Sequence, residues 1–502
     1  MPLSHRTSVV ASLLRTTRVT RVDLDARLRL LLSAIDRDPG ATADLPALVR
    51  AAVVALTDAP RSTVWLALAV LRAELPTVAE VVDTDRAAQL EGPEAILLRA
   101  ARQISRSTAR RRVRIVADTT IIDLGELVTN PLGTGIQRVA RQVTTQWVAH
   151  HEATLVGWTA AGDALRALSP EEQRDALDGT VPHDAATRER RSAEHETVIV
   201  PWRCTYLLPE LTVDARRCAA LQSLATHSEN RTAVIGFDLV PVTSAETSAA
   251  GFANGFALNL AAVAHFDVVG AISAAAATEY SGWSRMLAGT GLPGPQIVEV
   301  PLPGHAPEPT PDDLAEAAAR LLVPGMPLVL VVGSHEPRKN HLAVLHAAEI
   351  LWRRGHRFSL SFVGGNSWGS EEFTARLEAL RGAGRAVESI SRMPDGLLWA
   401  AYRLARFTVF PSINEGFGLP VAESLSAGTP ALTSGYGSMA EIAEHGGALL
   451  VDPRDDEAVV EAFARLLVDD ALVDHLVHEA RRRPPTSWAD YAERLWDSFH
   501  AG

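Results

Sequence analysis

The fold is decided by residues 327–340, which read PLVLVVGSHEPRKN. The apolar run Leu328–Val332 predicts a strand that is buried on both faces, as in a parallel sheet. The segment His341–Arg353 has apolar residues at helical spacing, and we expect Asn340 to cap this helix. The two basic residues before Asn340 therefore follow a strand and precede a helix, where an anion is favoured. A turn with two solvated basic residues explains the same pattern equally well.

Residues 411–423 read PSINEGFGLPVAE and carry a second pattern. Gly416 and Gly418 allow backbone N–H groups to approach a ligand closely. Glu415 lies in this loop and Glu423 in the first turn of the helix that follows, so both side chains can face one cleft. A carboxylate accepts two hydrogen bonds at once, which suits the vicinal hydroxyls of a sugar. For Glu423 the alternative is simple compensation of the helix dipole, worth about 0.3–1 kcal/mol.

Short apolar strands alternate with helical segments from Val113 onward, which predicts two parallel sheets with helices on both faces. The proline-rich segment Pro301–Pro311 is typical of a linker between them. Ligands of such sheets bind at the carboxyl ends of the strands. The predicted strands are Val113–Ala117, Thr154–Trp158, Val198–Pro201, Thr232–Phe237, Val268–Ile272, Ile297–Val300, Leu328–Val332, Phe358–Val363, Phe407–Phe410, Ala431–Ser434 and Ala448–Val451.

Residues 1–112 predict only helices. The predicted helices are Leu24–Ile35, Leu45–Leu56, Thr63–Leu75 and Pro93–Ile104. A basic run follows, for which we weigh a solvated helix face at a domain junction against a contact with a membrane surface or lipid phosphate. It consists of Arg99, Arg102, Arg106, Arg110, Arg111, Arg112 and Arg114.

Composition excludes several classes of protein. The 502 residues include 48 Lys+Arg against 60 Asp+Glu, a net charge of −12, which argues against a general nucleic-acid coat. An apolar fraction of 47% excludes wholesale disorder. Two cysteines fit a reducing compartment, and neither a secretion signal nor a membrane-spanning run is expected. We therefore expect a cytoplasmic protein, either free or peripheral to the inner face of the membrane.

Three motifs together resemble one family: EPRKN at 336–340, EGFGLPVAE at 415–423 and SGYGSMAE at 434–441. They are similar to the retaining, GT-B-fold glycosyltransferases of family four (glycosyltransferase group 1). The resemblance implies two tandem Rossmann-like domains of α/β class, and it does not cover the all-helical extension predicted before them. The expected boundaries are 1–112 for the helical extension, 113–305 for an acceptor domain, 306–484 for a nucleotide-sugar donor domain, and 485–502 for a helix that returns to the acceptor domain.

The resemblance also implies roles for single residues. Arg338 and Lys339 would neutralise the leaving nucleoside diphosphate, Glu423 would hold the ribose diol, and Glu415 would hold hydroxyls of the donor sugar. Asp238 would contact the acceptor or the donor sugar, and capping of a turn is the equal alternative. Glycines and nearby amides would approach the diphosphate and sugar; these positions are Gly133, Gly135, Gly333, Gly364, Gly416, Phe417, Gly418 and Leu419.

Two positions depart from the family pattern. Phe237 stands where many relatives carry a histidine, and Ser334 stands where some carry an arginine. The pairs Asp23-x-Asp25 and Asp83-x-Asp85 have the spacing of a metal-binding motif, but they lie in the helical region, so we expect no metal and no other cofactor. Ser273 is a further cleft-facing candidate.

The predicted activity is transfer of a hexose, of mannose or rhamnose type, from a nucleotide-diphosphate sugar with retention at the anomeric carbon. The expected acceptor is a glycan or lipid-linked hydroxyl in bacterial surface polysaccharide synthesis. The alternatives are a natural-product glycosyltransferase, a phosphorylase or epimerase of the same fold, and a catalytically silent sugar-binding scaffold. A membrane-surface or protein contact through residues 1–112 and no nucleic-acid partner are also expected.

Overall fold

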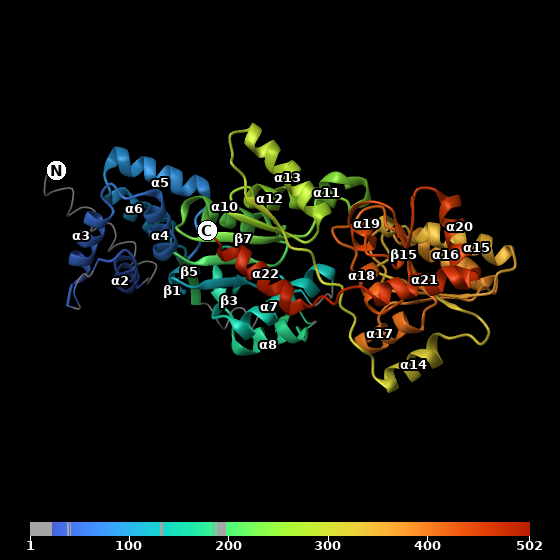
Figure 1. Cartoon of the computed structure of the whole chain (residues 1–502). Coiled ribbons are helices and arrows are strands. Elements are labelled where there is room, and N and C mark those ends of the chain that lie inside the picture. The colour runs from blue at the N-terminus through green and yellow to red at the C-terminus, as the bar shows by residue number, and fades with distance from the viewer. Residues whose placement is uncertain are drawn as a thin grey trace.

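The computed structural model describes residues 23–37, 40, 42–130, 134–182, 184, 186–187 and 197–501. Figure 1 shows three parts in succession: a group of N-terminal helices, a first sheet with helices on both faces, and a second such sheet. The described strands form a nine-stranded sheet and a six-stranded sheet. This architecture confirms the predicted α/β class and the helical region that precedes it.

The first sheet has the strand order β1-β5-β4-β3-β2-β6-β7-β8-β9. Its neighbours pair in parallel except around β4, which pairs antiparallel with β3 and β5 and so departs from the expected all-parallel sheet. The strands are β1 (Arg112–Ala117), β2 (Thr120–Asp123), β3 (Ala153–Trp158), β4 (Leu165–Ala167), β5 (Thr197–Trp202), β6 (Thr205–Leu208), β7 (Arg231–Gly236), β8 (Val268–Ala271) and β9 (Gln296–Glu299).

Two long strands of this sheet are bent. Asp118, at φ 53°, separates β1 from β2, and Arg203, at φ 55°, separates β5 from β6. The ladder continues across the bend, because Asp118 N donates to Trp202 O and Thr205 N donates to Thr119 O. The half formed by β1 and β5 therefore extends beyond the body of the sheet.

The N-terminal helices pack on this extension. They are α2 (Leu24–Ala34), α3 (Leu45–Ala55), α4 (Arg61–Arg72), α5 (Val78–Glu91), α6 (Glu94–Gln103) and the 3₁₀ turn η1 (Thr108–Arg110). Helix α4 is the centre of the group, since every residue from Thr63 to Arg72 is buried. Its Trp65 lies in the same apolar core as Ile199 and Trp202 of β5. The helical region and the first sheet thus share one core.

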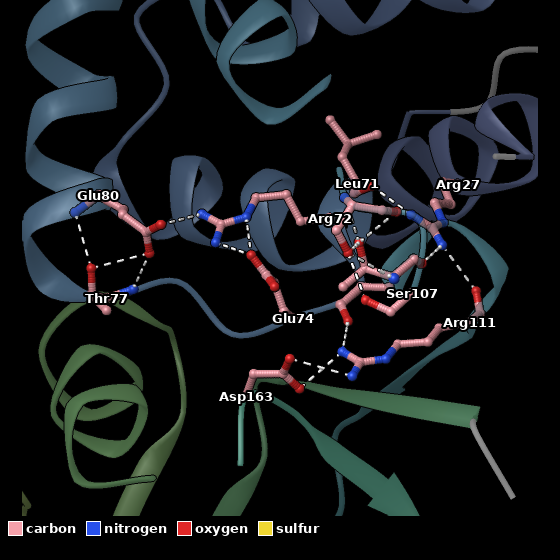
Figure 2. A network of polar contacts seen from close by, with 12 residues as sticks. Arg27, Leu71, Arg72, Glu74, Thr77, Glu80, Ser107, Arg111 and Asp163 are labelled. Atoms are coloured by element: carbon pink, nitrogen blue, oxygen red, sulfur yellow. Dashed lines mark hydrogen bonds and ion pairs between the residues drawn. The ribbon is translucent and has the colours of Figure 1, made fainter. Parts of the chain in front are cut away.

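Buried arginines complete this junction (Figure 2). Arg27 donates to the carbonyl oxygens of Leu71 at 2.7 Å, Thr108 at 2.8 Å and Arg111 at 2.9 Å. Arg111 in turn pairs with Asp163 of the β3–β4 turn, at 2.9 Å between Nη1 and Oδ1. The interpretation of the basic run as a solvated face is therefore wrong for Arg111, which is only 8% exposed because it serves as an internal cross-link.

Successive residues of a strand in the first sheet point to opposite faces, and a different layer of helices covers each face. Helices α10 and α12 cover the face that carries Ile121, whereas α7 and the C-terminal helix α22 cover the face that carries Ile122. Figure 1 shows α7 and α22 side by side. The helices of this unit are α7 (Gly135–His150), α8 (Pro170–Asp178), α10 (Ala215–His227), α11 (Val240–Thr243), η2 (Ala245–Thr247), α12 (Phe252–Val263) and α13 (Ala274–Gly289).

The second sheet is parallel throughout, in the order β12-β11-β10-β13-β14-β15. Its strands are β10 (Leu328–Val332), β11 (Ser359–Val363), β12 (Val387–Ile390), β13 (Phe407–Phe410), β14 (Ala431–Ser434) and β15 (Ala448–Val451). Its helices are α14 (Pro311–Leu321), η3 (Pro337–Lys339), α15 (His341–Arg353), α16 (Glu371–Gly382), α17 (Asp395–Leu404), α18 (Leu419–Ser426), α19 (Gly437–Ala443), α20 (Asp456–Val468) and α21 (Asp470–Arg481).

Helix α22 (Trp488–His500) returns to the first sheet. Ser487 caps its N-terminus by accepting a hydrogen bond from Asp490 N at 3.1 Å. Trp147 of α7 donates to the carbonyl oxygen of Ala492 at 2.8 Å, and Arg231 donates to that of Phe499 at 2.7 Å. In the described residues no helix is both long enough and apolar enough to span a membrane.

Candidate active site

The loops that follow β10 and β11 meet at two glycines. Gly333 has φ 141° and Gly364 has φ 155°, in the region where other residues are strained. A Cβ on Gly364 would lie 2.0 Å from Gly333 O, and one on Gly333 would lie 3.0 Å from Lys339 Cδ. Glycine is therefore required for these two loops to touch and for the Lys339 side chain to pass beside them.

The two basic residues of the first motif share one carboxylate. Arg338 Nη1 lies 2.6 Å from Glu415 Oε2, and Lys339 Nζ lies 3.3 Å from Glu415 Oε1. Ser412 Oγ also donates to Glu415 Oε1, at 2.9 Å. The fold thus brings Arg338, Lys339 and Glu415 together from the loops after β10 and β13, with side chains that are 11–15% exposed.

This triad keeps Glu415 ionised. Burial on its own would raise the pKa of Glu415, but the charges of Arg338 and then Lys339 more than offset burial and hold that pKa at about 2. Burial on its own would lower the pKa of Arg338, but the charges of Glu415 and Glu336 raise that pKa. At neutral pH the carboxylate is therefore charged and occupied by internal cations.

Hydroxyl groups after β14 hold the loop that carries Glu415. Each of them donates to a backbone carbonyl oxygen of that loop: Ser434 to Ser412 at 2.5 Å, Tyr436 to Ile413 at 2.6 Å and Ser438 to Glu415 at 2.9 Å. The third motif of the sequence thus supports the second. Ser412 and these hydroxyls were not among the predicted site residues, although the serines and the tyrosine stand in the quoted motifs.

The prediction that Asn340 caps α15 is wrong. Asn340 adopts a left-handed conformation, with φ 55°, and makes no side-chain cap hydrogen bond to the helix. Its Nδ2 donates instead to the carbonyl oxygen of Pro453, at 2.8 Å. The tight turn η3 over Pro337–Lys339 forces this backbone conformation and points the amide toward the neighbouring loop.

Glu423 lies on α18 and is 3% exposed. Its Oε1 lies 2.5 Å from Arg138 Nη1 on α7 of the first sheet unit, and its Oε2 accepts a hydrogen bond from Tyr402 OH at 3.0 Å. The Arg138 guanidinium also lies over the Trp399 ring, 5.2 Å from its centroid. Burial raises the pKa of Glu423, with the charge of Arg138 opposing that rise. Glu423 is the residue predicted to hold the ribose, and both of its carboxylate oxygens therefore already contact protein side chains.

The N-termini of α7 and α18 face each other across the cleft. Thr134 caps α7 in a capping box with Gln137, which explains why the helix begins at Gly135. A Cβ on Gly135 would lie 3.9 Å from Leu419 Cδ1, at the first residue of α18. Gly418, which precedes α18, has φ 105°. The predicted residue Gly133 lies outside the described residues.

Asp238 belongs to the first sheet unit and lies against the glycine loop of the second unit. A Cβ on Gly416 would lie 2.3 Å from Phe237 O and 2.9 Å from Asp238 Cβ, so only glycine permits this approach. Asp238 Oδ1 accepts a hydrogen bond from Val240 N at 3.1 Å, which is the turn-capping role weighed from the sequence. Burial, partly offset by Arg338, raises the pKa of Asp238 to about 6.

Further polar contacts join the two units beside this loop. Ser273 Oγ donates to Gly416 O at 2.6 Å and also caps α13. Glu441 of α19 accepts hydrogen bonds from the backbone N–H groups of Ala274 at 3.0 Å and Ala275 at 3.2 Å, where its charge suits the N-terminus of α13. Phe417 lies in an apolar core that both units share. The two sheet units are therefore in direct contact beside the Gly416 loop.

The acidic pairs of the helical region have structural roles. Asp23 caps α2, and Asp25 pairs with Arg29 at 2.8 Å. Asp83 and Asp85 form ion pairs with arginines as well, at 3.6 Å and 2.8 Å. Across the described part of the chain, no group of three or more His, Cys, Asp or Glu side chains is arranged to hold a metal ion.

Comparison with known proteins agrees with the motifs. Residues 312–483 match the family model of Glycosyl transferases group 1. The serotype-specific mannosyltransferase WbdA of Escherichia coli is 26% identical over 356 residues, which are 68% of this chain and 40% of that protein. A D-inositol 3-phosphate glycosyltransferase of Acidothermus cellulolyticus is 38% identical over 182 residues, 34% of this chain and 40% of that protein. The chain thus matches about two fifths of the length of these relatives.

A solved structure shows the same fold. Anabaena Alr3699/HepE, in complex with UDP and glucose, superposes with a TM-score of 0.54 at 11% identity, covering 76% of this chain and 100% of that one. These findings confirm the resemblance to the GT-B-fold, group 1 glycosyltransferases.

Proposed function

Because residues 312–483 belong to the glycosyl transferases group 1 family, we propose that this protein moves a hexose from a nucleotide-diphosphate sugar to an acceptor hydroxyl. The observation that carries the proposal is the ion-paired group of Arg338, Lys339 and Glu415 in the loops that follow two adjacent parallel strands, with buried Glu423 on helix α18. This is where ligands bind in open parallel sheets. Mannose or a mannose-like sugar is the proposed cargo, supported by relatives named as mannosyltransferases.

Charge stabilisation is the proposed contribution of Arg338 and Lys339. As the bond between the anomeric carbon and the diphosphate breaks, negative charge grows on the departing phosphate oxygen. Two cations held at that point stabilise the developing charge more than the ground state, which is what accelerates the step. We propose that they leave Glu415 for the diphosphate, and that Glu415 then accepts hydrogen bonds from hydroxyls of the sugar.

Retention at the anomeric carbon and independence from metal belong to this proposal. In a same-face attack the acceptor oxygen forms its bond as the phosphate departs, and the phosphate takes the acceptor's proton. The acceptor side is assigned to the first sheet unit, where Asp238 approaches Gly416. Closure of the units over the cleft would exclude water and suppress hydrolysis of the donor.

The proposed acceptor is a glycan or lipid-linked hydroxyl in surface polysaccharide synthesis, at the inner face of the membrane. Support comes from relatives named for O-antigen and serotype-specific mannosyl transfer. Exposed arginines of α6, η1 and β1 without an ion-pair partner among the described residues suit an anionic surface; they are Arg102, Arg106, Arg110, Arg112 and Arg114.

A panel of UDP-, GDP-, dTDP- and ADP-sugars in thermal-shift assays tests donor binding, because a ligand that binds only the folded state raises the melting temperature. The donor that stabilises the protein is then incubated with mannosylated acceptors, with and without EDTA, and the product's anomeric configuration is read by NMR. Glu423→Gln serves as the binding-site control. Donor binding without transfer to any acceptor would favour the silent scaffold, and loss of activity in EDTA would contradict metal independence.

A further inference from the structure

Arg138 is the cation of the cleft to which the family motifs give no role. It is the fourth residue of α7 and belongs to the first sheet unit, yet it forms its ion pair with Glu423 of the second unit at 2.5 Å. The side chain of Glu423 is 4% exposed and that of Arg138 is 31% exposed. The carboxylate is thus fixed in the interior, whereas the guanidinium reaches it from the cleft side.

Each cation of the site forms an ion pair with a carboxylate of the same site. Arg338 and Lys339 lie on Glu415, and Arg138 lies on Glu423. In the proposed complex the hydroxyls of the sugar donate hydrogen bonds to Glu415 and those of the ribose donate to Glu423. The three cations then no longer have these carboxylates as partners. The diphosphate of a nucleotide sugar carries two negative charges and is the anion available to them.

Two cations alone would not suit this anion. Arg338 and Lys339 carry two positive charges against the two negative charges of Glu415 and Glu423, and Glu336 and ionised Asp238 add further negative charge. A site of that composition would present no net positive charge to a dianion. Arg138 adds one more positive charge, which makes the site more favourable to the diphosphate than the two cations alone.

We propose that Arg138 is a third, movable cation of the donor site: it rests on Glu423 while the cleft is empty, and it passes to the diphosphate when the ribose diol takes Glu423. The inference rests on the proposed function and identifies a residue that positions the donor from the opposite unit. The contact of Arg138 with the diphosphate would also couple donor binding to closure of the two sheet units, since the first unit supplies this contact.

The position of Arg138 permits this exchange. Its guanidinium lies one turn from the N-terminus of α7, and that N-terminus faces the first residue of α18, Leu419. In a nucleotide the C5′–O5′ link joins the ribose ring to its first phosphate, so the diol and the diphosphate lie on neighbouring groups of one ligand. The ring of Trp399 supports the resting position by cation–π contact.

The test compares nucleoside and nucleoside diphosphate by calorimetry in the full chain. The probes are uridine and UDP, guanosine and GDP, thymidine and dTDP, and adenosine and ADP, with the pair that wild type binds carried forward. For Arg138→Gln we expect the diphosphate to bind about tenfold more weakly or worse, as for loss of one hydrogen bond to a charged group. Affinity for the nucleoside should be unchanged or tighter, because Glu423 no longer has a competing cation.

Two further variants sharpen the comparison. Arg138→Lys keeps the charge and should retain diphosphate affinity to within about threefold of wild type, since an ammonium also binds phosphate. Arg141→Gln removes a charge from the next turn of the same helix, where Arg141 donates to Ala176 O within its own unit. It should leave both affinities within about twofold of wild type, as expected for a charge that makes no contact with the ligand.

Each remaining outcome is decisive. If Arg138→Gln lowered the affinities for nucleoside and diphosphate equally, Arg138 would have a merely structural role. An unchanged affinity for the diphosphate would contradict the assignment. Arg138→Lys binding the diphosphate as weakly as Arg138→Gln would contradict it too. A wild-type protein that binds none of the four diphosphates contradicts the proposed function itself, which separates the two failures.

Discussion

Replacing Glu415 by glutamine should cost the second sheet unit about 3 kcal/mol of stability at neutral pH. Glu415 titrates at about 2 in the folded protein, against 4.5 for the free side chain. A difference of roughly 2.5 pKa units at 1.36 kcal/mol each gives about 3 kcal/mol. Removal of one partner from a buried ion pair costs roughly 3–5 kcal/mol in other proteins, which is consistent. In this variant Arg338 and Lys339 remain buried side by side without their carboxylate.

The pH dependence distinguishes this cause from a general packing defect. Because the folded-state pKa of Glu415 is lowered, its stabilisation is fully present above pH 4.5 and is lost as the pH falls through about 2. The stability difference between wild type and Glu415→Gln should therefore be largest near pH 7 and shrink steadily below pH 4.5. A defect in packing alone would leave the difference independent of pH.

The assay is urea unfolding followed by circular dichroism and tryptophan fluorescence, at pH 7 and at intervals down to pH 3.5. Glu378→Gln is the matched control, because Glu378 pairs with Arg381 on the surface of the same unit, at 3.1 Å and 63% exposed. Such a surface pair contributes at most about 1 kcal/mol. A loss below about 1 kcal/mol in Glu415→Gln at pH 7, or a loss that does not change with pH, would refute the reasoning.

Four other substitutions test separate parts of the structure. Lys339→Ala should slow donor turnover by roughly 10²–10³-fold, and full activity of Lys339→Arg would show that any cation suffices there. Asp163→Asn should leave Arg111 buried without a countercharge and lower stability by about 3 kcal/mol, seen as a lower melting temperature of the whole chain. Asp238→Asn should remove the step near pH 6 from the pH–rate profile, since wild-type Asp238 is ionised only above that pH. Gly364→Ala should abolish nucleotide binding, because its Cβ would lie 2.0 Å from a backbone oxygen; unchanged calorimetry would contradict this.

The second sheet could be predicted from the sequence almost residue by residue. The predicted bounds of β10, β13, β14 and β15 agree with the structure. These strands are central or paired with long helices, so each reads as a compact apolar run between polar turns. The end of each run then locates its loop, which is why Arg338 and Glu415 were placed at the same edge of the sheet.

The first sheet could be predicted only in part. Strands β2 and β6 were missed because each is four residues long and continues a strand that bends at a residue with positive φ, Asp118 or Arg203. Strand β4 was missed because it has only three residues. Strand β12 of the second sheet was missed as well, because its four residues, VESI, include two polar residues in succession. Helix α5 was missed because its apolar residues do not follow one clear stripe. The partners of Arg27 and Arg138 depend on tertiary contacts over 44 residues or more, which no local pattern contains.

Two carboxyl groups that influence Arg338, those of Glu415 and Asp238, differ in their titration. Glu415 makes direct ion pairs with two cations and titrates at about 2, whereas Asp238, whose nearest partner is a backbone amide, titrates at about 6. Glu415 is therefore ionised throughout the pH range in which Asp238 titrates, and it holds Arg338 and Lys339 in place by ion pairs. Asp238 is protonated below about pH 6 and ionised above it, so its charge beside the Gly416 loop depends on pH. Because Asp238 comes from the first sheet unit and Glu415 from the second, the contact between the two units brings a fixed and a titrating carboxyl together.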